Sequence, residues 1–303
     1  MRNTLIDVDG LGGTLFEPAE EPAAVLVVHP ATATPAGFYT GFASFLAENR
    51  IAVVTYDYRG TGRSGSPRDH REVGMRDWIE QDVPAMTAWA AARFPGLPQL
   101  AVGHSVGGHA LALGRGGPGL TAFVLVASHV ASIAAIPDRV ERLRVRLVLS
   151  LLGPALAGFL GYVPARRLGL GEDISVAAVR QWAGWGALPN YLFDDPVMRG
   201  AERAAAVTQP VLVIGLSDDP WATPGQVGEL AARLPNAQVE RRTHTPADAG
   251  VQRIGHHGFM RRSARDTLWP DLLTWLQKRI ADAPQGADSP QRADAPDGTD
   301  TQR

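Results

Sequence analysis

The sequence predicts an α/β fold in which a mostly parallel central sheet is flanked by helices. Short runs of consecutive apolar residues are typical of strands that are buried on both faces of a sheet. Between these runs, apolar residues recur three and four positions apart, which is the spacing of one helix face. Strands that alternate with helices in this way form a parallel sheet. The expected strands are residues 24–29, 51–56, 99–102, 121–126, 210–215 and 238–241.

Turn residues and helical spacing predict the elements around these strands. Residues 4–16 are expected to form a hairpin, because Asp9-Gly10 and Gly12-Gly13 supply residues that favour turns. Pro84 is expected to kink the helix in which it lies, since proline cannot donate a backbone hydrogen bond. The expected helices are residues 38–49, 75–94 and 267–280.

Two segments interrupt the alternation and define the expected domains. Residues 128–207 are too long for one crossover connection and carry their own tryptophans, glycines and prolines, so we expect an inserted, mainly helical cap. Residues 1–127 and 208–281 then form the core. Residues 282–303 have no large apolar side chain and are expected to be disordered, because they cannot bury enough surface to offset the entropy of ordering.

Composition excludes several classes of function. The formal net charge of -2 over 303 residues offers no basic surface, so nucleic acid is not an expected partner. The absence of cysteine excludes a disulfide framework and a thiolate zinc site. The histidines lack metal-site spacing, so we expect neither a metal nor a cofactor. The first residues have no apolar segment of signal-peptide length, and a cytoplasmic location is expected.

One short motif, Gly103-His-Ser105-Val-Gly107, carries most of the functional information. Apolar residues precede it and an Ala/Leu run follows it, which is the strand–turn–helix context of a nucleophilic serine. The serine must sit on a tight, strained turn, where the glycines remove side chains that would collide. We therefore expect Ser105 to be a nucleophile, with a bystander serine in a glycine-rich turn as the alternative.

Two further groups complete the chemistry that such a serine needs. A serine nucleophile requires a histidine to accept its proton and usually a carboxylate to orient that histidine. Asp218-Asp219 follow the strand at 210–215, and His256-His257 follow the strand at 238–241. Serine, acid and histidine thus occur in the order expected for a hydrolase triad on a sheet of this type.

Taken together, these motifs resemble the α/β-hydrolase fold family over about residues 4–281. The segment 57–64, Asp-Tyr-Arg-Gly-Thr-Gly-Arg-Ser, is similar to the loop that follows the family's fourth strand. More narrowly, the chain resembles a bacterial group of predicted alpha/beta hydrolases of undefined substrate. The features that carry this narrower resemblance are Phe38-Tyr39, Asp218-Asp219-Pro-Trp221, Trp182-Ala-Gly-Trp185 and Gly255-His-His-Gly-Phe259.

The resemblance implies a role for each triad residue. Ser105 aligns with the nucleophile. His256 aligns with the general base, because the family's histidine usually follows a glycine directly, and His257 is the alternative. Asp218 stands three residues after a glycine, which is the family's usual spacing, so it is the preferred acid. Asp219 is the alternative acid.

The resemblance also implies two backbone amides that would stabilise an oxyanion. The first is the N–H of Val106. The second comes from the loop after the strand at 24–29, where relatives carry His-Gly-x and this chain has His29-Pro30-Ala31. Because proline has no N–H, Ala31 is expected to supply the second amide, with Thr32 as the fallback.

Within the expected cap, residues 147–165 carry no charge. We expect cap helices there, folded over the serine with their apolar faces toward the cleft. Membrane contact is not expected, although four arginines precede this segment and surface attachment to a membrane is the alternative. These arginines are Arg139, Arg142, Arg144 and Arg146.

The residues and the resemblance together predict a serine hydrolase of the carboxylesterase or lipase kind. It would cleave an ester, thioester or amide of a small-molecule substrate with an apolar acyl group, through an acyl-enzyme. One alternative is an acyltransferase on the same triad. Another is a cofactor-free haloperoxidase-like or C–C bond hydrolase activity. A third is a binding protein that has lost the chemistry, against which the intact serine, acid and histidine argue.

Overall fold

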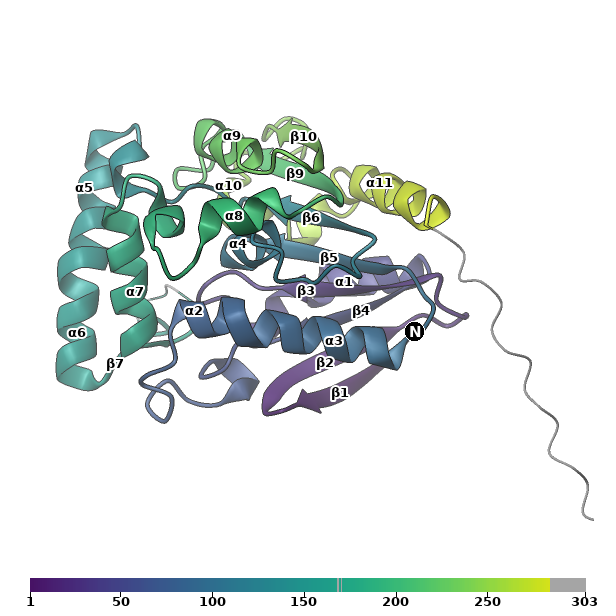
Figure 1. Ribbon diagram of the computed structural model, residues 1–303, viewed down its shortest axis with the longest axis horizontal. Coiled ribbons are helices and arrows are strands. Elements are labelled where there is room, and N and C mark those ends of the chain that lie inside the picture. The colour runs from purple at the N-terminus through teal and green to yellow at the C-terminus, as the bar shows by residue number, and fades with distance from the viewer. Residues whose placement is uncertain (168, 170, 284–303) are drawn as a thin grey trace, which may run out of the picture.

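Eight strands form one sheet through the middle of the molecule (Figure 1). The structure is a computed structural model that describes residues 1–167, 169 and 171–283, so the predicted tail lies outside the described residues from position 284 on. The order across the sheet is β1 (Arg2–Val8), β2 (Leu11–Glu17), β4 (Ile51–Tyr56), β3 (Ala24–His29), β5 (Gln99–His104), β6 (Ala122–Val126), β9 (Pro210–Leu216) and β10 (Gln238–His244).

The predicted, mostly parallel sheet is confirmed. β1 and β2 form the expected antiparallel hairpin, and its two turn residues, Asp9 and Gly10, have φ values of 52° and 83°. Positive φ at both positions is typical of a type I′ turn, whose twist matches that of the strands. β2 also pairs antiparallel with β4, whereas every later pair in the sheet is parallel.

The strand register brings the carboxyl ends of the central strands to one edge of the sheet. His29 at the end of β3 pairs with Gly103 of β5, and His104 at the end of β5 pairs with Val126 at the end of β6. Every residue of β3 and β4 is buried, as the continuous apolar runs predicted. In open parallel sheets, ligands bind outside the carboxyl ends of the strands, so this edge is where a site is expected.

Helices pack on both faces of the sheet. α1 (Thr40–Glu48) and α11 (Trp269–Ala281) share one face, where the ring centroid of Trp269 lies 5.3 Å from those of Phe42 and Phe45. α3 (Val83–Arg93) crosses in front of the sheet in Figure 1. Other helices of the core are α2 (Met75–Asp77), α4 (Val106–Ala112), α9 (Pro224–Ala232) and α10 (Gly255–Gly258).

The proline expected to disturb the second helix does so through a π-helical turn. This turn, Trp78–Asp82, joins α2 to α3, in which Pro84 is the second residue. At the end of the turn, the Val83 N–H donates to the Trp78 carbonyl, five residues back. The helix is therefore locally widened just before a residue that cannot donate a backbone hydrogen bond.

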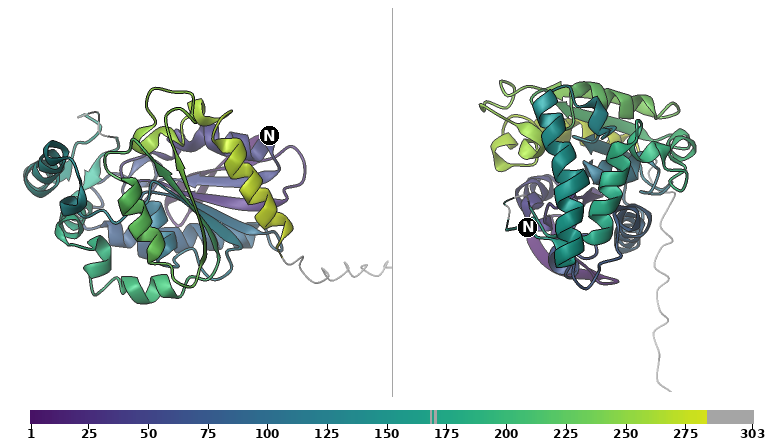
Figure 2. Two further views of the ribbon diagram at one scale, coloured as in Figure 1. Left: turned by 90° about the horizontal axis from the view of Figure 1, so that it is seen from above. Right: turned by 90° about the vertical axis from the view of Figure 1, so that its left-hand side faces the viewer.

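Between β6 and β9 the described residues are mainly helical, and we call this segment the insertion. Its longest helix, Arg139–Leu160, consists of α5 (Arg139–Leu147), a π-helical turn (Val148–Leu152) and α6 (Gly153–Leu160). This long helix stands at the outer end of the molecule, beside α7, as Figure 1 and the right-hand view of Figure 2 show. The insertion also contains α7 (Val176–Ala187), α8 (Gly200–Ala205), β7 (Tyr162–Val163) and β8 (Ile174–Ser175).

The long helix does not bury its apolar residues in the predicted way. We expected the apolar faces within residues 147–165 to point toward the cleft, but Leu147, Leu151 and Leu152 are exposed, and Phe159 is 90% exposed. Of an apolar stretch of 18 residues within this helix, only 11% is buried. The physical reason is that α7 packs along one side of the helix, while apolar residues occur around its whole circumference. In the described part of the chain, it is the one helix long and apolar enough to cross a membrane.

Candidate active site

Ser105 lies on a strained turn between β5 and α4. Its φ of 52° and ψ of -111° are sparsely populated by residues other than glycine, so neighbouring groups must hold this conformation. Its N–H donates to the Val126 carbonyl at 3.0 Å, and its own carbonyl accepts from the N–H of Gly108 and the Ser128 hydroxyl, both at 3.0 Å. The strained serine predicted from the motif is therefore present at the carboxyl edge of the sheet.

Close packing explains why glycines surround the serine. A Cβ on Gly103 would lie 2.4 Å from the Gly108 nitrogen, and one on Gly107 would lie 2.2 Å from the His29 carbonyl oxygen. A Cβ on Gly108 would lie 1.9 Å from the Ser128 hydroxyl oxygen. A side chain at Gly103 or Gly107 would push α4 away from β5 or β3, and one at Gly108 would collide with the Ser128 side chain.

The acid that contacts the histidine is Asp219. Its Oδ2 lies 2.7 Å from Nδ1 of His256, while its Oδ1 accepts from the backbone N–H of Trp221 and Ala222 at 2.9 and 3.0 Å. Burial alone would raise the pKa of Asp219, but the attraction of His256 and these hydrogen bonds lower it to about 2. The carboxylate is thus ionised and held against the imidazole.

The geometry favours Asp219, the alternative acid, over the preferred Asp218. The Asp218 carboxylate points to the backbone and accepts from the N–H of Ile254 at 2.8 Å and of Gly255 at 3.0 Å. Asp218 therefore holds the loop that carries His256, and the neighbouring carboxylate reaches the ring. The spacing after Gly215 placed the loop correctly, but two adjacent side chains point in different directions, and spacing alone does not tell which one faces the histidine.

The two candidate histidines also have different partners. His257 Nε2 lies 3.2 Å from the Thr34 hydroxyl, and its ring packs edge-on against Phe38 at a centroid distance of 5.8 Å. Burial, followed by the nearby His256, lowers the pKa of His257 to about 4. Since the carboxylate of Asp219 contacts His256, the geometry favours His256 over His257 as a base.

Ser105 and His256 are linked through the residue before the serine. His104 Nε2 lies 3.0 Å from the His256 carbonyl oxygen, and the two rings are 5.3 Å apart. Within residues 1–167, 169 and 171–283, the Ser105 hydroxyl makes no hydrogen bond. Catalytic hydrogen bonds are often long or poorly aligned without substrate, so the lack of this hydrogen bond does not argue against proton transfer once a substrate is bound.

Two backbone amides, those of Val106 and Ala31, were predicted to stabilise an oxyanion, and they differ in whether a hydrogen-bond acceptor already occupies them. Val106 is the first residue of α4, so its N–H has no acceptor within the helix. The Ala31 N–H donates to the Tyr39 hydroxyl at 2.9 Å and is therefore occupied. Thr32, the fallback, makes no hydrogen bond from its N–H among the described residues.

The bond to Ala31 belongs to a buried chain of hydrogen bonds whose polarity can be assigned. A carbonyl oxygen only accepts, so His104 Nε2 must donate to His256. Burial lowers the pKa of His104 well below its usual value, so its Nδ1 is an unprotonated acceptor. The Tyr39 hydroxyl, 2.9 Å away, therefore donates to this nitrogen and accepts from Ala31. Phe38-Tyr39 belongs to the features that carry the narrower resemblance, but that resemblance implies no role for either residue.

The turn that carries Thr32 is held by the insertion. The Thr34 N–H donates to the Ala31 carbonyl at 3.2 Å, and Ala33 has a φ of 58°, as the third residue of a type II turn does. The Ala33 carbonyl accepts from the Glu172 N–H at 2.7 Å. The backbone after β7 thus fixes a strained turn next to the candidate site.

A second contact joins the insertion to the loop that carries Asp218 and Asp219, which we call the acid loop. The Trp221 indole N–H donates to the Glu141 carboxylate of α5 at 2.9 Å. The same indole lies 5.4 Å from the His256 ring, measured between centroids. Trp221 therefore lies between α5 and the candidate base, a contact that the sequence did not predict.

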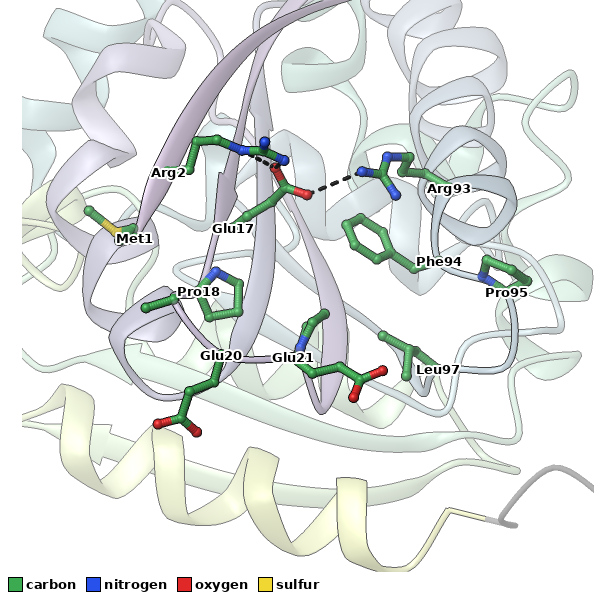
Figure 3. A pocket seen from close by; sticks show the side chains of 12 residues that line it. Met1, Arg2, Glu17, Pro18, Glu20, Glu21, Arg93, Phe94, Pro95 and Leu97 are labelled. Atoms are coloured by element: carbon green, nitrogen blue, oxygen red, sulfur yellow. Dashed lines mark hydrogen bonds and ion pairs between the residues drawn. The ribbon is translucent and has the colours of Figure 1, made fainter. Parts of the chain in front are cut away.

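A hollow of about 710 Å³ lies elsewhere, at the opposite edge of the sheet (Figure 3). It is bordered by the segments that precede β3 and β5, whereas the histidines and Ser105 follow the strands. The Glu17 carboxylate in its wall is already paired with Arg2 and Arg93. In the part of the chain that the structure describes, no cluster of histidine and carboxylate side chains could hold a metal ion.

Comparison with known proteins agrees with the fold described above. Residues 20–172 match the family model described as Serine aminopeptidase, S33. The chain belongs to this family of α/β hydrolases. The chain is also 30% identical over 223 residues to a monoacylglycerol lipase of Mycolicibacterium smegmatis, a match that covers 68% of this chain and 75% of that protein. The resemblance found in the sequence is therefore confirmed.

Solved structures of the same superfamily share the fold. A soluble variant of monoglyceride lipase from Saccharomyces cerevisiae, in complex with a substrate analogue, superposes with a TM-score of 0.65 at 17% identity, covering 91% of this chain and 94% of that chain. A monoacylglycerol lipase of Paleococcus ferrophilus gives a TM-score of 0.56 at 16% identity, covering 89% of this chain and 99% of that chain. At these identities the likeness shows the α/β-hydrolase architecture of this family member.

Proposed function

We propose that this S33 family member is a serine esterase that cleaves monoacylglycerol-like esters of apolar acyl groups. Ser105 is the nucleophile, His256 the general base and Asp219 the acid that orients it. One observation carries this assignment: an ionised carboxylate lies 2.7 Å from the histidine that follows β10, while a strained serine occupies the same edge of the sheet. The named relative, a monoacylglycerol lipase, supports the ester class.

The chemistry proceeds in two half-reactions. His256 accepts the Ser105 hydroxyl proton as the oxygen attacks the ester carbonyl, and the resulting imidazolium is stabilised by Asp219. Collapse of the tetrahedral intermediate breaks the ester C–O bond, and His256 donates its proton to the departing glycerol oxygen. Water then attacks the acyl-enzyme with His256 again as base, which releases the fatty acid and restores the serine.

The negative charge on the attacked carbonyl oxygen needs donors that are fixed in advance. We assign these to the backbone N–H groups of Val106 and Thr32. Val106 lies at the positive end of α4. Thr32 is favoured over Ala31 because the Tyr39 hydroxyl already accepts the Ala31 N–H. Holding the Thr32 turn is then the role of the contact between Ala33 and Glu172.

A fluorophosphonate probe followed by mass spectrometry tests the nucleophile. We expect covalent labelling at Ser105, and Ser105→Ala should abolish both the labelling and the hydrolysis of monoacylglycerol and p-nitrophenyl esters. Ser217→Ala is the matched control, because Ser217 is an exposed serine beside the acid loop and should remain dispensable. Labelling at another residue, with activity retained in Ser105→Ala, would refute the proposed triad.

A further inference from the structure

The outer surface of the long helix Arg139–Leu160 carries a row of apolar side chains that nothing in the described chain covers. Val140, Leu143, Leu147 and Leu151 succeed one another at intervals of three and four residues, so they share one face of the helix. All four are exposed, Val140 by 77% and Leu151 by 60%. We call this row the outer stripe.

The outer stripe points away from the body of the protein. The opposite side of the helix, which includes Val145, Leu149 and Gly153, is the less exposed one. Gly153 is buried, and a Cβ there would lie 3.1 Å from the Val179 side chain of α7. Residues two positions apart are separated by about 200° around a helix, so the outer stripe lies on the side opposite to α7. Figure 2, in its right-hand view, shows this helix in front of the rest of the chain.

Positive charge accompanies the apolar row. The helix contains four arginines and one glutamate, a net charge of +3, although the whole chain has a net charge of -2. Arg144 pairs with Glu141 at 2.8 Å, whereas Arg139 and Arg146 have no ion-pair partner within the described residues. Exposed apolar side chains next to unneutralised arginines complement a layer that is apolar inside and anionic at its surface.

By length and mean hydropathy alone the helix could cross such a layer. Its uncharged part is shorter than the hydrocarbon layer, however, so the helix is better suited to lie on the surface. Its uncharged part, Leu147–Leu160, has 14 residues and spans roughly 21 Å at 1.5 Å per residue, against about 30 Å of hydrocarbon in a bilayer. The left-handed residue Gly161 ends it. The contacts of the helix with α7 and Trp221 also keep it attached to the rest of the protein.

We propose that the outer stripe and its arginines dock this protein onto an anionic lipid surface, with the long helix parallel to that surface. The Glu141 carboxylate of this helix holds the Trp221 indole, which lies against His256. Docking would therefore bring the candidate site close to the lipid. If the protein cleaves the proposed esters, docking would place Ser105 near esters that partition into membranes. This consequence rests on the proposed function, whereas the docking itself requires no catalysis.

Vesicle flotation of the full-length chain tests the proposal. We expect the protein to float with phosphatidylglycerol vesicles and much less with phosphatidylcholine vesicles. Leu143→Ser/Leu147→Ser/Leu151→Ser should weaken binding by on the order of a hundredfold, because it removes the apolar side chains that would insert. Arg139→Gln/Arg146→Gln should weaken it by about fivefold per arginine, and only on anionic vesicles. The matched control, Leu5→Ser/Val197→Ser, changes exposed apolar residues elsewhere and should bind like the parent.

Two further measurements separate the possible outcomes. Hydrolysis of a water-soluble short-chain ester should be equal in all of these variants. Hydrolysis of monoacylglycerol in vesicles should be slower in the variants that bind vesicles more weakly. Equal vesicle binding by the parent and the triple variant would overturn the proposal. A parent that does not bind vesicles but sediments as a dimer, and a triple variant that sediments as a monomer, would instead assign the stripe to a second copy. A parent that binds vesicles but cleaves no ester would refute the proposed function and leave the docking intact.

Discussion

The Asp219 carboxylate lies 2.7 Å from Nδ1 of His256, while the adjacent Asp218 binds only the backbone N–H groups of the loop that carries this histidine. Two neighbouring residues thus divide the work of orienting one imidazole. Asp219 contacts the ring, and Asp218 holds the chain on which the ring is mounted.

This division predicts different effects of matched substitutions. Asp219→Asn should lower kcat for ester hydrolysis by about three to four orders of magnitude, because an amide no longer stabilises the protonated imidazole or selects its tautomer. Asp218→Asn keeps one acceptor for the loop amides and should lower kcat by less than about tenfold. Steady-state kinetics on a soluble ester checks both, and the reverse ranking would show that Asp218 is the triad acid.

Thr32→Pro isolates the proposed oxyanion donor. Thr32 is the second residue of a type II turn, where proline fits, so the substitution removes one N–H while keeping the turn. We expect kcat to fall by about 10²- to 10³-fold with little change in KM. Ala33→Gly is the control: it keeps every amide, relieves the positive φ at Ala33 and should leave kcat near that of the parent. Normal activity in Thr32→Pro would assign the donor elsewhere.

Tyr39→Phe should separate positioning from packing. It leaves the Ala31 N–H and the His104 Nδ1 buried without partners, at a cost of about 1–3 kcal/mol each in the free energy of unfolding. The lost link also loosens the turn that carries Thr32 and the contact from His104 to the His256 carbonyl. Urea unfolding should show the loss of stability, and kinetics should show a fall in kcat rather than a rise in KM. An unchanged free energy of unfolding would contradict the assigned hydrogen-bond chain.

Glycines 107 and 184 should respond to alanine in opposite directions. At Gly107 the new Cβ would lie 2.2 Å from the His29 carbonyl oxygen, so we expect a loss of more than about 2 kcal/mol in the free energy of unfolding and little activity. At Gly184, within α7, nothing lies within 4 Å, and alanine should stabilise by about 0.5–1 kcal/mol. Thermal or urea unfolding of the two variants checks this, and destabilisation of Gly184→Ala would contradict the packing of α7.

Buried neutral histidines should make the fold sensitive to acid. Burial lowers the pKa of five histidines far below 6.5, so between about pH 4 and 6.5 the unfolded chain binds protons that the folded chain excludes, and stability falls as the pH drops through this window. Each contributes up to about 1.4 kcal/mol per pH unit. Burial raises the pKa of Asp82 to about 6. Near pH 5 the folded chain therefore binds roughly one proton at Asp82 that the unfolded chain releases, which offsets the proton uptake of one histidine. The five are His29, His104, His109, His129 and His257.

The pH dependence of urea unfolding measures this proton uptake. Near pH 5 we expect unfolding to take up about four protons, five from the histidines less one from Asp82. Asp219, whose folded pKa is about 2, adds stability that is present above pH 3.8 and lost only as the pH falls toward 2. A free energy of unfolding that stays level between pH 7 and 5 would show that these histidines are hydrated.

The sequence by itself determined the sheet, the position of the serine and the order of the three candidate catalytic groups. Buried parallel strands require continuous apolar runs, and the tight turn at Ser105 requires glycines, so both leave local patterns in the chain. The register that brings the ends of β3, β5 and β6 together follows from that pattern, since loops after parallel strands meet at one edge.

Only the tertiary structure decided which neighbouring carboxylate contacts the histidine and which backbone amide is already hydrogen-bonded. Asp218 and Asp219 are indistinguishable by charge and differ by one position, and the direction of each carboxylate depends on how its loop folds against His256. Likewise, the Ala31 N–H is taken by Tyr39 from a different element, which no local pattern records. The apolar run at residues 147–165 predicted a helix but not its outward face, because the side that is buried depends on where α7 packs. Hydrophobic patterning is local, whereas hydrogen-bond partners and helix contacts are set by residues far apart in the chain.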